Sequence, residues 1–193
     1  MTLRVETGLS APQNFIEDVF YIDRTVYKPE LCGKIENLYK RHNFCPDSFI
    51  LIYDEDTLAG YMNLFPISDT LYDQLNSPSF FKMRDDDIEP HEMENWSKDK
   101  PNNLFIISIA IMPSYRNGEA IKLLGSACLS FLREKDKEGY KIGSISGSAI
   151  SIGGENFLKR LRGVFVKELE EGYRYYFTDN ENARSLIENG LLL

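Results

Sequence analysis

The stretch "IAIMPSYRNGEAIKLL", residues 109–124, contains the change of local structure on which the prediction of the fold depends. The apolar run 103–112 has strand character and is nearly continuous, which is typical of a strand buried on both faces. Pro113 cannot donate a hydrogen bond to a strand ladder, so it ends this strand. A helical pattern begins a few residues later, after Arg116 and Gly118. The stretch therefore predicts a strand, a tight turn and a helix.

The expected start of this helix has the composition of a site for an anion. The first four N–H groups of a helix lack intrahelical partners, and together with the helix dipole they attract phosphate. Gly118 has no side chain to obstruct a ligand, Ala120 adds little bulk, and Arg116 offers two-pronged hydrogen bonds to phosphate oxygens. The alternative is an ordinary turn with a solvated arginine, because strand, turn and amphipathic helix occur in every α/β protein.

The segments on either side alternate between expected strands and helices. Apolar residues at three- and four-residue spacing, interrupted by Pro29 and Gly33, predict two short helices in 15–42. Two β-rich runs around the turn "DEDT" predict a hairpin in 48–67. The other expected elements are a short strand in 3–8, a helix that stops near Gly139, a strand in 140–151, a helix in 155–163, a hairpin formed by 164–169 and 173–178, and a last helix capped by Asp179 or Asn180.

This order predicts an α/β (α+β) fold with a mixed sheet. The strand–helix–strand segment in the middle favours a parallel central strand pair joined through a crossover helix, while the hairpins favour antiparallel neighbours and helices on both faces. Residues 68–103 are expected to form an irregular acidic insertion, since they contain Pro90 and Pro101 and show no steady period. Either a solvated loop or a substrate-steering lid would explain this insertion.

Bulk composition excludes several classes of protein. The 193 residues are expected to form a single domain, and their net charge of −8 disfavours a nucleic-acid binder. No segment approaches the ~18 uninterrupted apolar residues that a membrane span needs. The three cysteines form no CxxC pair, which predicts reduced thiols and a cytoplasmic location. His42 and Cys45 are two potential ligands and do not make a metal site, so no metal is expected.

The opening stretch resembles the acetyl-CoA-binding motif of the GNAT superfamily of N-acetyltransferases. That motif has a strand ending in hydrophobic-x-Pro, then Arg or Gln, two variable residues, Gly, one residue, and Gly or Ala. Ile111, Pro113, Tyr115 and Arg116 match it as they stand. Without a gap, Glu119 and Ile121 would occupy the two small-residue positions. With a loop one residue shorter, Gly118 and Ala120 occupy them, and Leu123 and Leu124 match the paired helical leucines.

The resemblance covers about residues 48–178 and implies a GNAT-like, largely antiparallel sheet. It implies acetyl-CoA as cosubstrate, with pantetheine held in a slot where the fourth and fifth strands diverge. The residues that it assigns to the cosubstrate are Ile109, Ala110 and Ile111 for pantetheine, Arg116, Asn117, Gly118, Glu119, Ala120 and Ile121 for pyrophosphate, and Asn156 beside the slot. "GSISGSAISIGG", residues 143–154, is an alternative nucleotide loop, but it lacks G-x-G-x-x-G and the repeated βαβ units around it.

The reaction implied by the resemblance is transfer of an acetyl group to a primary amine. A cationic acceptor is compatible with the acidic balance, and a homodimer is left open. The catalytic acid and base stay unassigned, because Ser108 stands where many relatives have a glutamate and Phe157 where many have a tyrosine. The residues that could approach the reacting atoms are Tyr173, Tyr175, Tyr176, Ser151 and Glu155. A non-catalytic GNAT-like module that binds acyl-CoA or a protein partner is the alternative function.

Overall fold

A computed structural model describes residues 2–82, 88–116 and 118–192 of the chain. The chain divides into two compact units. Unit 1 comprises Met1–Leu64, Asp85–Pro90 and Ile107–Cys128, and unit 2 comprises Phe65–Arg84, His91–Ile106 and Leu129–Leu193. Within the described residues, the strands form a seven-stranded sheet in the order β1-β2-β3-β4-β5-β7-β6.

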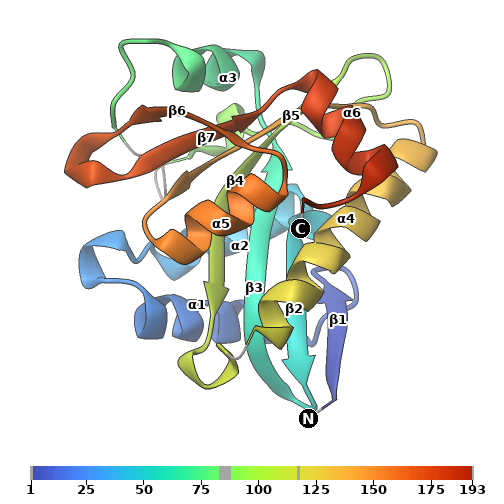
Figure 1. The fold of residues 1–193 in the computed structure, drawn as a ribbon. Coiled ribbons are helices and arrows are strands. Elements are labelled where there is room, and N and C mark those ends of the chain that lie inside the picture. The colour runs from blue at the N-terminus through green and yellow to red at the C-terminus, as the bar shows by residue number, and fades with distance from the viewer. Residues whose placement is uncertain (1, 83–87, 117, 193) are drawn as a thin grey trace. The chain divides into compact units, whose positions relative to one another are not determined.

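Unit 1 is built on an antiparallel sheet with helices packed against it (Figure 1). Its elements are β1 (Leu3–Thr7), α1 (Phe15–Val26), α2 (Ile35–Phe44), β2 (Phe49–Asp54), most of β3 (Thr57–Pro66), the end of β4 (Asn102–Ile111) and the first half of α4 (Glu119–Lys137). β1 pairs with β2 from Leu3↔Asp54 to Thr7↔Ile50. β2 pairs with β3 from Phe49↔Asn63 to Asp54↔Thr57, as the hairpin prediction requires.

The core of unit 1 follows from the two-residue period of its strands. Phe49, Leu51 and Tyr53 point to one face of β2, where they form a cluster with residues of α1 and α2. Ile50 and Ile52, which point to the other face, are buried as well. Figure 1 shows α4 in front of this sheet and α1 and α2 behind it. Both faces of the sheet are therefore covered.

The two ends of α4 have the local chemistry that the sequence predicts. Gly118 precedes its first residue with a φ of +96°, and Ala120, Leu124 and Cys128 are buried along one stripe. At the other end, Gly139 has a φ of +97°, its N–H bonds to the Asp136 oxygen, and the next N–H bonds to the Lys135 oxygen. These two bonds form a Schellman motif, in which the glycine adopts the left-handed turn that ends the helix.

Unit 2 contains the parallel strand pair. Its elements are α3 (Asp69–Asn76), the start of β4, the end of α4, β5 (Ile142–Ala149), α5 (Ile152–Arg160), β6 (Val164–Glu168), β7 (Arg174–Thr178) and α6 (Asn180–Asn189). β4 and β5 run parallel from Asn102↔Ile142 to Ile106↔Gly147. β7 pairs antiparallel with both β5 and β6. The prediction of a mixed, mostly antiparallel sheet with one parallel pair is confirmed.

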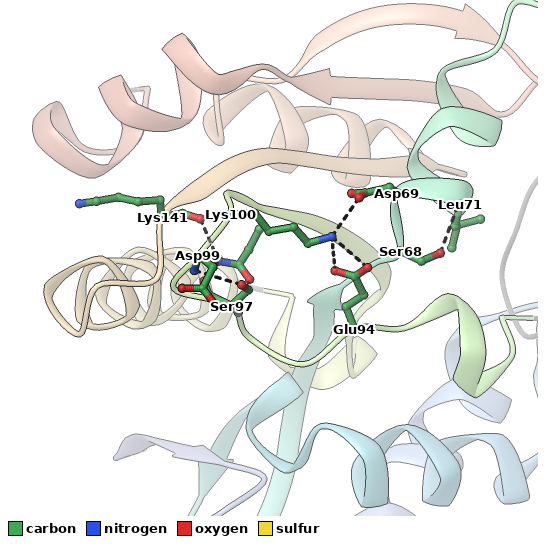
Figure 2. Close-up of polar contacts among 9 residues, drawn as sticks. Ser68, Asp69, Leu71, Glu94, Ser97, Asp99, Lys100 and Lys141 are labelled. Atoms are coloured by element: carbon green, nitrogen blue, oxygen red, sulfur yellow. Dashed lines mark hydrogen bonds and ion pairs between the residues drawn. The ribbon is translucent and has the colours of Figure 1, made fainter.

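The segment 68–103 is more ordered than the sequence indicates. It contains α3, whose N-cap Ser68 accepts a hydrogen bond from the Leu71 N–H at 3.2 Å. Figure 2 shows the Lys100 ammonium between the carboxylates of Asp69 and Glu94, at 3.0 Å and 2.8 Å. The expectation of an irregular insertion is therefore wrong for α3, whose apolar residues Leu71 and Leu75 are buried one helical turn apart.

One predicted helix begins earlier than expected. The sequence pattern predicts its start at Glu155, with Gly153 and Gly154 in the preceding loop, whereas α5 begins at Ile152. The Ser151 hydroxyl caps this helix by accepting a hydrogen bond from the Gly154 N–H at 3.1 Å. A capping serine offsets the low helix propensity of glycine in the first turn. Asn156 thus lies in the second turn of α5 and does not open it.

Among the described residues, no helix combines the length and the apolar character that crossing a membrane requires.

Candidate functional site

The end of β4, the turn that follows it and the start of α4 together hold most of the described residues that the sequence assigns to the cosubstrate. β4 ends at Ile111, and Pro113–Tyr115 forms a short 3-10 turn. The Arg116 side chain is exposed, and its Nε donates a hydrogen bond to the Ile111 carbonyl oxygen at 3.1 Å. This bond holds the guanidinium at the turn, because it ties the side chain to the end of the strand. Asn117, which the motif also includes, lies outside the described residues.

Gly118 makes the start of α4 accessible. Its carbonyl accepts the first hydrogen bond of the helix, from the Lys122 N–H at 3.3 Å. A side chain added at Gly118 would meet no heavy atom within 4 Å, so the space above the glycine is open. Ala120 is fully buried, whereas Glu119 is exposed and Ile121 is half-buried. This helix start can therefore receive an anion on the Gly118 side.

The end of β4 lies close to β3. The Met112 N–H donates to the Ala59 carbonyl oxygen at 2.9 Å. A Cβ at Gly60 would lie 2.8 Å from the Ala110 oxygen and 2.4 Å from Ile111 Cδ1, so only glycine allows this approach. Ala110 and Ile111 are buried, but residues 107–109 are half-buried, so the expectation of a strand buried on both faces is wrong for this segment.

Ser108, at this half-buried position, belongs to a chain of polar groups inside unit 1. Its Oγ lies 2.7 Å from the Tyr61 hydroxyl and 3.1 Å from the Tyr27 hydroxyl. The Tyr61 hydroxyl donates to the buried Asp23 carboxylate, and the Tyr27 hydroxyl donates to the Ile109 carbonyl oxygen at 2.7 Å. Three segments that are distant in sequence thus place a carboxylate and three hydroxyls next to the strand segment assigned to pantetheine.

Ser108 is the one member of this hydrogen-bonded chain that the sequence resemblance singles out, and its three partners lie outside the motif. Asp23 lies four residues after Val19 on the apolar stripe of α1 and is only 8% exposed. A carboxylate on a buried stripe is unusual, because burying a charge is costly unless it is hydrogen-bonded. That interruption of the stripe is a signal that could have identified Asp23. Nothing local distinguishes Tyr27 and Tyr61 from the other tyrosines of the chain.

Burial keeps the hydroxyls of Tyr27 and Tyr61 protonated. It raises the pKa of Tyr61 well above its usual value, and the nearby Asp23 charge raises it further. It also raises the pKa of Tyr27, although the hydrogen bond to Ser108 acts in the opposite direction. Neither hydroxyl ionises near neutral pH, so neither is a base.

In unit 2, the structure brings two of the candidate residues together. The Tyr176 hydroxyl donates to the Glu155 carboxylate at 2.7 Å, and Arg174 donates to the same oxygen at 3.1 Å. These bonds, the Tyr176 bond first, hold the pKa of Glu155 below its usual value. Glu155 thus joins α5 to β7. In this setting it serves as an ionic link between the two elements.

The other candidates in unit 2 have surroundings that differ from those of Glu155 and Tyr176. Ser151 caps α5, and Tyr173 donates to Glu171 at 3.0 Å. Tyr175 is fully buried, and burial raises its pKa to about 12. Phe157 is buried too, and Asn156 is exposed on α5.

This chain is similar to solved proteins in its fold and has little sequence identity with them. No family model matches the sequence, and no curated protein matches it. The structure titled as a GphF GNAT-like decarboxylase in complex with isobutyryl-CoA is similar to this chain at 11% identity and a TM-score of 0.68, over 92% of this chain and 99% of that one. The loading GNATL domain of CurA from Lyngbya majuscula is similar at 11% identity and a TM-score of 0.67, over 94% and 99%. The chain has a GNAT fold.

A structure titled as an acetyltransferase of the GNAT family from Staphylococcus aureus shares the GNAT fold as well. It is similar at 13% identity and a TM-score of 0.58, over 93% of this chain and 99% of that one. These neighbours differ in their titles, which include a decarboxylase, a loading domain and an acetyltransferase. The GNAT fold is therefore shared among proteins of different activity, and the reaction has to be argued from the site.

Proposed function

We propose that this protein is an N-acetyltransferase that transfers the acetyl group of acetyl-CoA to a primary amine. The observation that carries the proposal is the open Gly118 at the start of α4, next to a guanidinium held at the end of β4. A neighbour with the GNAT fold is titled as a complex with isobutyryl-CoA, and another as an acetyltransferase. The fold and this anion site together favour acyl-CoA as the cosubstrate.

The residues present fit a diphosphate. Helix geometry aims the N–H groups of the first turn of α4 out of its N-terminus, and a negative charge is stabilised there. Because no side chain stands above Gly118, an oxygen can approach these donors. Arg116 adds a charge-assisted pair of donors beside them. This arrangement supports the shortened motif, in which Gly118 and Ala120 take the two small-residue positions.

The reaction makes three chemical demands. The acceptor ammonium has to lose a proton, the tetrahedral oxyanion needs a hydrogen-bond donor, and the departing sulfur needs a proton. In this proposal the backbone of Ile109, Ala110 and Ile111 positions the pantetheine arm. Glu119 and Ile121 contribute main-chain groups at the start of α4, with Asn156 of α5 a further cosubstrate contact. The net charge of −8 is compatible with a cationic acceptor.

Replacement of Arg116 tests the diphosphate site. Arg116→Ala should weaken binding of acetyl-CoA by about 1.5–3 kcal/mol, the range for a hydrogen bond to a charged group. Isothermal titration calorimetry measures this loss directly. The matched control is Arg184→Ala on α6, which removes an arginine whose side chain is 79% exposed. An Arg116→Ala variant with the affinity of the wild type would mean that the diphosphate binds elsewhere.

A second candidate function is acyl-CoA binding without acetyl transfer. It is favoured by Ser108 and Phe157, which replace the glutamate and tyrosine that the resemblance leads one to expect. Release of CoA thiol with any primary amine from a panel would establish transfer. Saturable binding of CoA without thiol release would instead establish the binding module.

The proposed setting is the reducing cytoplasm, because the three cysteines of the sequence form no CxxC pair. The single-domain organisation also remains our proposal.

A further inference from the structure

The polar chain in unit 1 is short of one proton. It contains four oxygen–oxygen contacts, which join Asp23 to Tyr61, Tyr61 to Ser108, Ser108 to Tyr27, and Tyr27 to the Ile109 carbonyl. Each hydroxyl has one proton to donate, and an ionised carboxylate and a carbonyl have none. With Asp23 ionised, three protons therefore serve four contacts. However the hydroxyls turn, one contact lacks a proton.

The distances indicate which contact this is. Tyr61 donates to Asp23, so Ser108 must give its proton to Tyr61, at 2.7 Å. Tyr27 donates to the Ile109 oxygen, also at 2.7 Å. The contact between Ser108 and Tyr27, at 3.1 Å, is left with two oxygen lone pairs facing each other. A proton added to Asp23 would let every group turn and donate to the next, and would fill all four contacts.

The unfilled contact lies at the less buried end of this hydrogen-bonded chain. Tyr27 and Ser108 are half-buried, whereas Tyr61 is fully buried and Asp23 nearly so. An N–H donor that reaches Ser108 and Tyr27 from outside would find two acceptors and no competing proton. The chain therefore accepts hydrogen bonds at its outer end and can store a proton at its inner end.

We propose that this chain takes the proton from the acceptor ammonium, with Ser108 and Tyr27 contacting the ammonium and Asp23 as the final proton acceptor. The inference rests on the proposed function. Ser108 and Tyr27 are then catalytic residues, because they contact the reacting nitrogen. Tyr61 and Asp23 act through Ser108.

The proton transfer balances along the chain. The ammonium gives one proton to Ser108 Oγ, as the Ser108 proton passes to the Tyr61 oxygen and the Tyr61 proton passes to Asp23. The acceptor becomes a neutral amine, Asp23 becomes a neutral acid, and both hydroxyls keep one proton each. The amine lone pair then forms the C–N bond, the C–S bond breaks, and the second amine proton accompanies the sulfur as a thiol. Asp23 finally returns its proton to solvent through the same chain.

Two ionisable neighbours of Asp23, Cys32 and Tyr61, are compatible with this role. The Cys32 thiol donates to the Asp23 main-chain oxygen at 3.4 Å. Burial, and then the Asp23 charge, raises the pKa of Cys32, although Arg24 acts in the opposite direction and Glu30 adds to the rise. The thiol is therefore neutral near neutral pH. The raised pKa of Tyr61 likewise keeps this hydroxyl in its proton-carrying form.

Steady-state kinetics with an amine that the wild type acetylates form the first arm of the test. Tyr61→Phe should lower kcat at neutral pH by roughly 10²-fold, the lower end of what general base catalysis supplies. The deficit should shrink as the pH approaches the pKa of the amine, because the acceptor then arrives without its extra proton. KM and Kd for acetyl-CoA should not change. Asp23→Asn should behave in the same way if Tyr61→Phe folds poorly.

Tyr53→Phe is the matched control for these kinetics. Tyr53 is also fully buried in unit 1, but its hydroxyl has no hydrogen-bond partner among the described residues. Its loss should leave kcat at every pH as in the wild type. A Tyr61→Phe deficit that is the same at all pH values, or an equal deficit in Tyr53→Phe, would overturn the relay.

The second arm is infrared spectroscopy of the free protein, which depends neither on acetyl-CoA nor on an acceptor. Acid-minus-neutral difference spectra should contain a carboxylic C=O band of protonated Asp23, identified by its loss in Asp23→Asn. Ser108→Ala should move this band to higher frequency, because the acid then donates into a shorter chain. If Ser108→Ala leaves the frequency of this band unchanged, the proposed proton transfer from Ser108 through Tyr61 to Asp23 is refuted, even if the protein acetylates amines. Absence of acetyl-CoA binding would refute only the proposed function. The infrared band would still test whether Ser108 is coupled to Asp23 through hydrogen bonds.

Discussion

At Gly118, the effect of backbone strain on stability can be measured separately from that of a steric clash. Its φ of +96° disfavours any side chain, while a Cβ there would meet no atom within 4 Å. Gly118→Ala should therefore lower the free energy of unfolding by about 1 kcal/mol through backbone strain alone. Urea denaturation with extrapolation to water measures this change.

Gly153→Ala is the control for that measurement. Gly153 lies in the first turn of α5, where a Cβ would have no neighbour closer than the Ser151 hydroxyl at 3.8 Å. Alanine is the better helix former, so this variant should gain roughly 0.5 kcal/mol. Equal effects of the two substitutions would contradict the strained conformation at Gly118.

The link between α5 and β7 should make the stability depend on pH. Hydrogen bonds from Tyr176 and then Arg174 lower the pKa of Glu155 in the folded protein. A carboxyl whose pKa is lower in the folded state stabilises the fold above its unfolded pKa, and this contribution disappears as the pH falls through the folded value. Stability should therefore decrease as Glu155 is protonated, in the range below its usual pKa of 4.5.

Glu155→Gln is the variant that separates this contribution from the rest of the molecule. Thermal unfolding recorded at several pH values should show a shallower loss of stability in acid than in the wild type. Tyr176→Phe removes the largest cause of the shift and should have a similar but smaller effect. Identical pH profiles for Glu155→Gln and the wild type would show that the link does not contribute.

The sequence predicts individual elements well where their signals are local. The hairpin of β2 and β3, the break between α1 and α2, and the Asp179 cap of α6 all follow from patterns within a few residues. The start of α5 was misplaced because two local signals compete there. Glycines indicate a loop, whereas Ser151 indicates a cap, and the cap determines where the helix begins.

The candidate site was predictable only in its contiguous part. Arg116 and Gly118 lie in one motif, and the structure has them in the turn and at the start of α4 as expected. The hydrogen-bonded chain of Asp23, Tyr61, Ser108 and Tyr27 joins residues in and just after α1, in β3 and in β4, so its members come together only when the sheet and α1 have formed. No spacing rule in a single sequence contains this information.

Continuity of the chain predicts how the whole molecule unfolds. β3, β4 and α4 each begin in one unit and end in the other, so neither unit holds a complete set of its own elements. Unfolding of one unit alone would require part of β3, part of β4 and part of α4 to unfold while the rest of each element stays folded. We therefore expect a single cooperative transition. Calorimetry should give equal calorimetric and van't Hoff enthalpies. Two resolved transitions would instead mean that the units are separate domains.

Cys32 gives this protein a natural attachment point for a fluorescent reporter. Cys45 and Cys128 are buried, and burial raises the pKa of the Cys128 thiol to about 12, so neither reacts readily in the folded state. Cys32 is half-buried, and its raised pKa makes mildly alkaline maleimide labelling the appropriate condition. Because the Cys32 sulfur lies 3.4 Å from the Asp23 main-chain oxygen, we expect a dye attached there to change its emission when an acceptor binds as proposed, without any engineered cysteine.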